Sequence, residues 1–500
     1  MATESFDILI VGGGIHGAAV ARDAAGRGLK VLLAEKGDYA SATSSASSKL
    51  IHGGLRYLEH LELKLVRESL VERAELLRAA PHLVAPLKFL LPIYNWQMRK
   101  AWTIHAGLAL YDLLSMGDGL PASGRLSSAE AASLPRLRQD NLSAVLRYHD
   151  CQTDDARLTL AVALDARTRG ADILNRRAVT AITALENGYA VDLDERGQRR
   201  RVETRFIVNA AGPFAPQVDA LTEAAPEPHP LQLIRGSHIV LPMPDPPALC
   251  AYTLQDEGER IVFVIPWLDA RFLIVGTTDV PHYGDPGTAH CSADEKAYLV
   301  HAYNRYFTNP GRTVTERDIV FTWSGVRALH GDPGEKKPSR ISRSPSLAAC
   351  AQGTGGFITL YGGKLTTHRA LAEDVLFMLN TFGLKMSGPW TKDVPLHGGS
   401  MSRPALLARA EQGPAALPLA TRQRWALTYG DKIEDLFARV ASDSAAAEEI
   451  APGLPRAELD YAVDAEDAMT AEDLLLRRTK LHLLLDEAGR EAVREWFAKA

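Results

Sequence analysis

The start of the chain constrains its fold more than any other stretch. An apolar run, FDILIV, leads into the pattern Gly12-x-Gly14-x-x-Gly17, and a helix-like run of small residues and a second apolar run follow, ending at Glu35. Glycines at this spacing let the backbone turn tightly and approach a pyrophosphate at a helix N-terminus, while an acidic residue about 20 positions on can accept a hydrogen bond from a ribose hydroxyl. Because these parts occur in the required order, the sequence predicts an α/β domain that binds a dinucleotide.

The segment after the second apolar run favours FAD over NAD. A simple NAD domain continues into further βαβ units, but here a loop rich in serine and glycine, ATSSASSKLIHGG, comes first, and we expect a helix over residues 58–78 after it. Such a loop brings backbone N–H groups and hydroxyls close to a ligand along its length, which suits a cofactor with an extended ring system. We therefore expect FAD as the cofactor.

Later segments return the chain to the same domain. A helix over residues 154–168 precedes a strand around Ile173, and a strand over residues 205–209 ends near Ala211 and Gly212. Their alternation of helix and strand is typical of a parallel sheet.

The last return is the stretch FITLYGGKLTTHR. It places Gly362 and Gly363 before a helix whose start carries Lys364 and Thr366. The N–H groups and positive dipole of a helix start suit the electron-rich end of a reduced flavin or an anionic substrate.

The remaining stretches predict two further domains. RIVFVIPWLDARFLIVG predicts a β-hairpin and, with LIRGSHIVLP, an antiparallel sheet over the flavin. From about residue 386 the chain is rich in alanine, leucine and arginine without a strand signal, and its RRTK motif at 477–480 suits a solvated face or a partner surface. We place an FAD-binding domain at 1–85, 150–218 and 345–385, a substrate domain at 86–149 and 219–344, and a helical domain at 386–500.

Composition excludes several classes of protein. The net charge of -5 argues against a protein that mainly binds nucleic acid. The four cysteines lie far apart with no C-x-x-C pair, so we expect neither a disulfide framework nor a metal site. The acidic leader before the first strand does not fit a signal peptide, and the apolar runs are too short or too interrupted to cross a membrane.

One segment suits a membrane surface. NWQMRKAWTIHAGLALYDLLSM sets Trp96 and Trp102 beside Arg99 and Lys100, ahead of an apolar helix. This combination fits the headgroup boundary of an anionic bilayer, and equally a partly exposed helix that packs on the substrate domain.

Motifs in order from residue 5 to about 395 resemble one family. They include ILIVGGGIHGAAVARDAAGRG, ATSSASSKLIHGGLRYLE, DDARL, NAAGPF, GSHIVLP, GTTD, SGVRAL and GGKLTTHR. Together they resemble the FAD-dependent aerobic glycerol-3-phosphate dehydrogenases of bacteria and mitochondria. The resemblance implies an α/β, glutathione-reductase-like flavoprotein with an FAD-binding Rossmann domain, an antiparallel-sheet substrate domain and a helical C-terminal domain. Such an enzyme oxidises sn-glycerol 3-phosphate to dihydroxyacetone phosphate and passes the electrons to ubiquinone or another membrane quinone.

The resemblance also implies a place and a set of site residues. The enzyme would be cytoplasmic, peripherally attached to the inner face of the cytoplasmic membrane, with a homodimer as a further expectation. A hydride would leave carbon 2 for flavin N5, with His52 or His238 as base and Arg327 stabilising the developing alkoxide. The substrate phosphate would be bound by Arg56, Tyr57, Arg327, Arg343 and Lys364. The FAD-binding residues would be Gly12, Gly14, Gly17, Glu35, Ser44, Ser45, Ser47, Ser48, Lys49, Ala211, Gly212, Gly362, Gly363, Lys364, Leu365 and Thr366.

Three alternatives stay open. A glycerol-3-phosphate oxidase would share the substrate residues and pass electrons to oxygen. A relative that acts on amino or hydroxy acids would use a carboxylate-binding arginine instead of several dispersed cations. A non-catalytic flavin-binding module would not need Arg56, Arg327 and Lys364 to converge. One residue departs from the family pattern, since His368 stands where a tyrosine often occurs.

Overall fold

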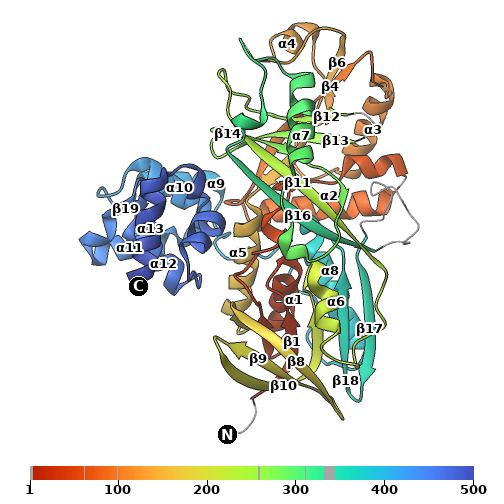
Figure 1. The fold of residues 1–500 in the computed structure, drawn as a ribbon, viewed down its shortest axis with the longest axis vertical. Helices are drawn as coiled ribbons and strands as arrows, with labels where there is room; N and C mark the ends of the chain where they lie inside the picture. Colours follow the sequence, from red (N-terminus) through yellow and green to blue (C-terminus); the bar gives the residue numbers. More distant parts are fainter. Residues whose placement is uncertain are drawn as a thin grey trace.

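The computed structural model describes residues 4–60, 62–97, 99–256, 260–309, 311–330 and 344–499. Figure 1 shows a lower part built on one sheet, an upper part built on a second sheet, and a helical lobe beside them that holds the C-terminus. This is the α/β architecture with a second sheet and a helical C-terminal domain that the sequence predicts.

The first sheet is mostly parallel and carries the predicted dinucleotide motif. Its strands are β1 (Glu4–Val11), β2 (Val31–Ala34), β7 (Asp172–Leu174), β8 (Arg177–Leu185), β9 (Gly188–Glu195), β10 (Gln198–Asn209), β17 (Ser346–Gln352) and β18 (Gly355–Tyr361). Among the described residues the order is β17-β18-β10-β1-β2-β7, with β9 paired to both β10 and β8. Strands β18, β10, β1 and β2 run parallel, so their carboxyl ends meet at one edge.

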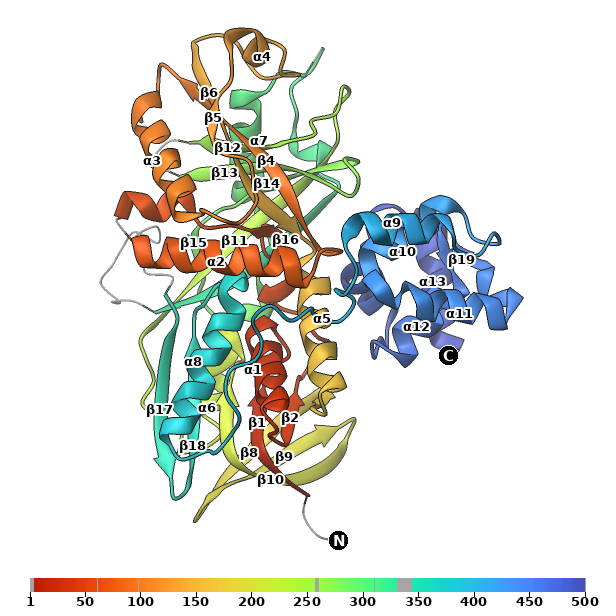
Figure 2. The ribbon, with the colours of Figure 1, turned by 180° about the vertical axis from the view of Figure 1, so that it is seen from behind.

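Three helices pack side by side against this sheet, as Figure 2 shows. They are α1 (Ile15–Gly26), α5 (Asp155–Thr168) and α8 (His368–Thr381). The alanines of α1 are buried, and their small side chains let α1 lie close to both neighbours.

The second sheet lies above the first and is mostly antiparallel. Its strands are β3 (Leu50–Ile51), β4 (Val84–Tyr94), β5 (Gly124–Arg125), β6 (Leu142–Thr153), β11 (Leu231–Pro242), β12 (Ala251–Gln255), β13 (Ile261–Trp267), β14 (Phe272–Gly276), β15 (Val280–Pro281) and β16 (Phe321–His330). Strand β16 pairs with β11 along its whole length, and β13 and β14 form the predicted hairpin. Helix α7 (Ala293–Tyr306) covers part of this sheet.

The helix predicted over residues 58–78 begins later than expected. A 3₁₀ segment, Leu55–His60, comes first, and α2 spans Leu63–Ala79. Helix α3 spans Ala101–Leu114 and packs on α2, and the short helices α4 (Ser128–Ala132) and α6 (Ala215–Asp219) complete the two sheet domains.

The C-terminal lobe is helical but not free of strands. It contains α9 (Arg403–Glu411), α10 (Leu419–Tyr429), α11 (Ile433–Ser442), α12 (Arg456–Asp464), a π-helical segment (Asp473–Arg478) and α13 (Glu487–Lys499). A small hairpin of β19 (Glu449–Ala451) and β20 (Leu454–Pro455) corrects the prediction of a lobe without strands. The prediction of a solvated face or partner surface at 477–480 is also wrong, because Arg478 and Lys480 are 1% and 3% exposed.

Candidate functional site

The predicted cofactor residues line the carboxyl edge of the first sheet. The residues that follow the four parallel strands there are Gly362 and Gly363 after β18, Ala211 and Gly212 after β10, Gly12 after β1, and Glu35 after β2. In open α/β sheets, ligands bind at this edge. The turns that leave this edge lie in close contact with one another. A Cβ atom added to Gly12 would lie 2.8 Å from the Ala210 carbonyl oxygen, and a Cβ atom added to Gly363 would lie 2.7 Å from the His16 ring.

The start of α1 has the geometry of an anion site. A Cβ atom on Gly17 would lie 1.9 Å from the carbonyl oxygen of Gly12, so the helix and the turn pack too closely for any other residue. Gly14 is the N-cap and supplies no side-chain cap, and the first turn of α1 contains no carboxylate. A helix start whose first turn carries no competing acidic side chain suits the pyrophosphate of FAD.

Glu35 is fixed against the same turn. Its two carboxylate oxygens accept hydrogen bonds from the backbone N–H groups of Gly13, at 2.6 Å, and Gly37, at 2.7 Å. Burial raises the pKa of Glu35, and these two bonds oppose that rise. The carboxylate therefore keeps one orientation, in which its remaining lone pairs suit a ribose diol.

The serine-rich stretch folds back over the start of α1. The Ser44 hydroxyl accepts a hydrogen bond from the Ile15 N–H at 2.9 Å, and the Ser45 hydroxyl donates to the Ala42 carbonyl. This contact keeps the stretch beside the anion site. Direct contact of Ser44 and Ser45 with a cofactor stays a prediction.

A buried carboxylate holds the end of the stretch. Asp155 accepts from the Ser47 N–H at 3.0 Å, from the Ser47 hydroxyl at 2.7 Å and from Lys49 Nζ at 2.7 Å. Lys49 is 2% exposed and has a left-handed backbone, with φ of 57°. These side chains therefore shape the loop, and their contact with a cofactor stays a prediction.

His238 is buried and bonded to the same stretch. Its Nε2 lies 2.9 Å from the Ser48 hydroxyl, and its ring stacks on Trp323 with centroids 5.0 Å apart. Burial and the positive charges of Arg327 and Lys49 hold the pKa of His238 well below its usual range. A neutral imidazole in this position orients Ser48, which favours a positioning role over that of the base.

Strand β16 brings the second sheet against the cofactor turns. Val326 accepts a hydrogen bond from the Thr43 hydroxyl at 2.7 Å, and the Trp323 indole donates to the Ser47 carbonyl at 3.1 Å. A Cβ atom on Gly362 would lie 3.4 Å from the Ala328 carbonyl oxygen. The strand thus runs from the serine-rich stretch to the turn after β18.

Arg327 projects from this strand. Its Nη1 pairs with Asp279 at 2.8 Å, and its Nη2 donates to the Thr277 hydroxyl at 3.3 Å. Arg327 also packs against Gly236, where a Cβ atom would lie 2.4 Å from Nη2. The two partners fix the plane of the guanidinium, whose side chain remains 23% exposed.

His52 follows β3, at the junction of the two sheets. Its neighbour Gly53 donates its N–H to the Tyr111 hydroxyl at 2.9 Å, and Tyr111 in turn donates to Asp150 at 2.7 Å. Arg73 pairs with Asp150, and all of these side chains are buried. The backbone beside His52 is therefore rigidly held, and the role of His52 as base stays a prediction.

Two of the predicted phosphate-binding residues lie together. Lys364 Nζ lies 3.9 Å from the centroid of the Tyr57 ring and 3.1 Å from the Ser69 hydroxyl. Arg343 and the side chain of Arg56 lie outside the described residues. The structure therefore brings Tyr57 and Lys364 together, while the complete phosphate site stays a prediction.

Sequence reasoning did not predict the contacts that support the site. Asp155 belongs to the quoted motif DDARL, but nothing in that motif indicated which loop it binds. Asp279 belongs to GTTD and lies between β14 and β15, whereas Arg327 lies in β16, so the spacing of the two residues in the sequence carries no signal. The one local signal is a carboxylate beside a predicted helix start, as in DDARL, which indicates that this carboxylate caps the helix.

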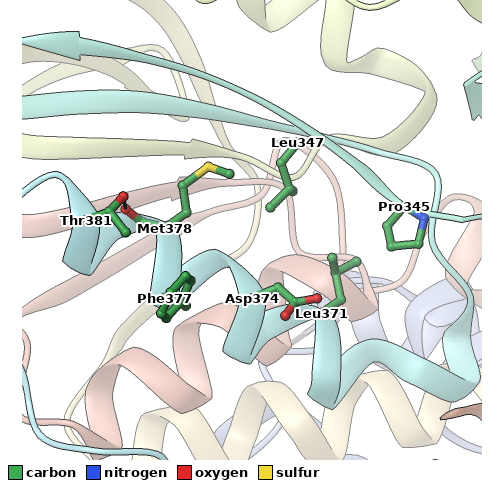
Figure 3. Close-up of a pocket in the computed structure, with 7 residues that line it drawn as sticks. All are labelled: Pro345, Leu347, Leu371, Asp374, Phe377, Met378 and Thr381. Carbon is green, nitrogen blue, oxygen red and sulfur yellow. Dashed lines mark hydrogen bonds between the residues drawn. The ribbon is translucent and has the colours of Figure 1, made fainter.

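A surface hollow of about 310 Å³ lies outside this site, between α8 and β17 (Figure 3). Its lining includes Leu371, Phe377 and Met378. A Cβ atom on Gly363 would lie 3.0 Å from Leu371, so the hollow lies behind the turn that follows β18. The predicted site residues do not line it. Over the part of the chain that the structure describes, acidic, histidine and cysteine side chains form no cluster that could hold a metal ion.

Comparison with known proteins identifies the family. The model described as "FAD dependent oxidoreductase" matches residues 7–369, and the model described as "C-terminal domain of alpha-glycerophosphate oxidase" matches residues 389–498. The aerobic glycerol-3-phosphate dehydrogenase of Escherichia coli is 40% identical over 99% of this chain and 98% of its own length. The D-erythritol 1-phosphate dehydrogenase of Brucella abortus is 39% identical over the same shares. The crystal structure of the glycerol-3-phosphate dehydrogenase from Bacillus halodurans complexed with FAD has a TM-score of 0.80 and 27% identity, covering 99% of this chain and 90% of that one. The chain therefore belongs to the FAD-dependent glycerol-3-phosphate dehydrogenase family, and FAD is its cofactor.

Proposed function

We propose that this enzyme oxidises sn-glycerol 3-phosphate to dihydroxyacetone phosphate and passes the electrons to a membrane quinone. The observation that carries the substrate is the contact of Lys364 with Tyr57 next to the turn after β18. Arg327 lies on β16 beside Ala328, whose carbonyl oxygen is close to the same turn. A phosphate monoester carries close to two negative charges and is bound best by forked guanidinium and ammonium groups. The near 40% identity over the full chain supports the same substrate class.

The side chains divide the work. The phosphate is held, and carbon 2 is oriented, by five side chains: Tyr57, Arg327, Lys364, Arg56 and Arg343. His52 accepts the hydroxyl proton, and Arg327 stabilises the negative charge that develops on that oxygen. His238 keeps Ser48 and the serine-rich stretch in place. When bound, FAD supplies the hydride acceptor at N5.

D-Erythritol 1-phosphate is the second candidate substrate. The relative named for it is only one percentage point less identical to this chain than the E. coli enzyme. Both compounds are phosphate monoesters of polyols, so the same cations bind either one. The longer carbon chain must be accommodated at the end of the site away from the phosphate.

An anaerobic titration tests both substrates. The purified yellow protein is mixed with each phosphate ester, and the visible absorbance of the flavin is recorded before a soluble quinone analogue or air is added. Two results together support the proposal. The flavin is bleached by sn-glycerol 3-phosphate at a much lower concentration than by the erythritol ester, and its absorbance recovers rapidly with quinone and slowly in air. Preferential bleaching by the erythritol ester selects the second candidate, rapid recovery in air selects an oxidase, and no bleaching by either rejects the substrate class.

The surface of α3 supports the membrane contact. Four exposed side chains of α3 and one just after it follow each other at intervals of three or four residues, which puts them on one face of the helix. They are Trp102, Ala106, Ala109, Leu113 and Met116. Trp102, Leu113 and Met116 are 74%, 61% and 71% exposed. Such an apolar face suits the interface of a bilayer.

The flanking charges favour an anionic bilayer at the inner face of the cytoplasmic membrane. Arg99 and Lys100 immediately precede the helix. None of the helices within the described residues is long and apolar enough to span a bilayer. The contact would thus be peripheral.

Flotation with vesicles tests this surface. We expect the wild-type protein to float with anionic phosphatidylglycerol vesicles and the Trp102→Glu/Leu113→Glu variant to stay behind. Leu249→Glu is the matched control, because Leu249 is also 74% exposed but lies outside α3. Equal flotation of the double variant and the control would place the membrane contact elsewhere. The homodimer stays a prediction, which sedimentation velocity tests.

A further inference from the structure

The C-terminal lobe contacts both ends of the serine-rich stretch. We define the serine loop as residues 36–49 and the RRTK segment as residues 477–480. The serine loop begins next to Glu35 and ends at Lys49, so it carries the part of the dinucleotide site between β2 and β3. The two contacts are formed by different residues of the RRTK segment.

The first contact holds the beginning of the serine loop. Arg477 Nε lies 2.5 Å from Asp38 Oδ2, and Arg478 Nη2 lies 2.8 Å from Asp38 Oδ1. Arg478 and Asp38 are each almost completely buried, and Arg478 also donates to the Glu466 carbonyl at 2.7 Å. A buried carboxylate with two guanidinium partners has one orientation only.

The second contact holds the end of the serine loop through α5. Lys480 Nζ donates to Asp154 Oδ1 at 2.9 Å, and Asp154 is the N-cap of α5. The adjacent Asp155 binds Ser47 and Lys49 of the serine loop. Lys480 therefore fixes the helix start that carries the acceptor for the loop.

A further ion pair and a further hydrogen bond surround these contacts. Arg157 of α5 bonds both oxygens of Glu466 at 2.7 Å, and the Tyr39 hydroxyl of the serine loop donates to Asp467 at 3.0 Å. Arg157 and Glu466 are buried. The interface between lobe and loop is therefore built of directional charged contacts, and small displacements of either side break them.

We propose that Arg478 and Lys480 are positioning residues for FAD, acting through Asp38 and Asp154 on the serine loop. Ordering of the loop by FAD and docking of the RRTK segment then favour each other, because each removes conformational freedom that the other must restrict. The C-terminal lobe thereby acquires a role in cofactor binding although it lies outside the first sheet. The inference requires FAD but does not depend on the proposed substrate.

Hydrogen–deuterium exchange on the wild-type protein tests this coupling directly. Exchange is compared between the holoprotein and protein stripped of FAD, over the serine loop, over residues 473–485 and over α11 as a control within the same lobe. We expect FAD to slow exchange in the serine loop and in residues 473–485, with α11 unchanged. Slower exchange in the serine loop alone would overturn the proposal.

A variant gives a second measurement. Lys480→Met keeps the length of the side chain and removes its charge, and Arg439→Gln is the control, since Arg439 pairs with Asp464 at 2.9 Å on an exposed face of the lobe. Titration of the stripped proteins with FAD, followed by quenching of flavin fluorescence, gives the dissociation constant. We expect the dissociation constant for FAD to rise about tenfold in Lys480→Met and to stay unchanged in the control. A rise of this size is comparable to the loss of affinity when a residue that supports a metal ligand is removed. An unchanged dissociation constant in a folded Lys480→Met protein would contradict the proposal, and if this variant fails to fold, the exchange experiment decides.

Discussion

Replacement of Gly17 by alanine tests the close packing at the start of α1. The added Cβ would lie 1.9 Å from the Gly12 carbonyl oxygen, more than 1 Å inside the distance that real Cβ atoms keep. Because the obstacle is backbone, the turn itself must move, and overpacking of this kind costs about 3 kcal/mol, the upper end of the usual range. Alanine also favours helix by up to about 1 kcal/mol. The net loss of folding free energy is therefore about 2 kcal/mol.

Thermal unfolding of the FAD-free protein, followed by circular dichroism, measures this loss. For a cooperative unit of 150–250 residues, about 2 kcal/mol corresponds to a fall in Tm of roughly 4–8 °C. Gly107→Ala is the matched control, since Gly107 also lies within a helix but a Cβ there meets nothing within 4 Å. We expect Gly107→Ala to raise Tm slightly. If Gly17→Ala also leaves Tm unchanged or raises it, the turn is not packed as described and the reasoning is refuted.

Two further predictions concern charge. Arg327→Lys keeps the charge but loses the fork that bonds Asp279 and Thr277, so we expect KM for the phosphate ester to rise about tenfold in steady-state kinetics. Arg312→Lys is the control, because Arg312 also forms an ion pair and its side chain is 63% exposed. Equal KM values for both variants would remove Arg327 from the phosphate site. Burial lowers the pKa of His368 to about 3, so the unfolded chain binds more protons at this residue below pH 6.5, and its contribution to stability is lost as the pH falls from 6.5 toward 3. By pH 4 the loss of unfolding free energy is about 3 kcal/mol. Denaturant unfolding of His368→Gln should therefore show a free energy of unfolding that falls less steeply with falling pH than in the wild type. An equally steep fall in both proteins would contradict this.

The sequence predicted the parts of the site that depend on local spacing. The glycine turn, Glu35 and the turn after β18 each follow a strand within a few residues, so their place at the sheet edge follows once the strands are known to be parallel. The hairpin of β13 and β14 was equally local. The composition of the serine-rich stretch predicted a loop beside a ligand; the structure places this stretch against the start of α1, and its contact with the cofactor stays a prediction.

The rest depends on contacts between segments far apart in the chain. Asp155 and Lys49 are 106 positions apart, and Arg478 and Asp38 are 440 positions apart, and a single sequence gives no indication that they meet. The RRTK motif illustrates the resulting error. Exposed helices commonly carry such charges, and their burial here depends in part on Asp38 and Asp154, two carboxylates of another domain that the motif itself does not reveal.

The positions of these carboxylates explain why the two sheets and the C-terminal lobe meet at one loop. The serine loop lacks a hydrophobic core of its own, since its residues from Ser41 to Lys49 are mostly small or polar. It is therefore ordered from outside: Ser44 bonds to α1, Ser47 bonds to α5, and Ser48 bonds to His238 of the second sheet. Each contact orders the loop only if the helix or strand that provides it is itself fixed. The start of α5 is fixed in part by Lys480 of the C-terminal lobe, which bonds to Asp154. A loop of this kind is fully ordered only when all three parts of the chain have assembled. Loss of the contact with His238 or with the C-terminal lobe should therefore weaken FAD binding before the first sheet unfolds.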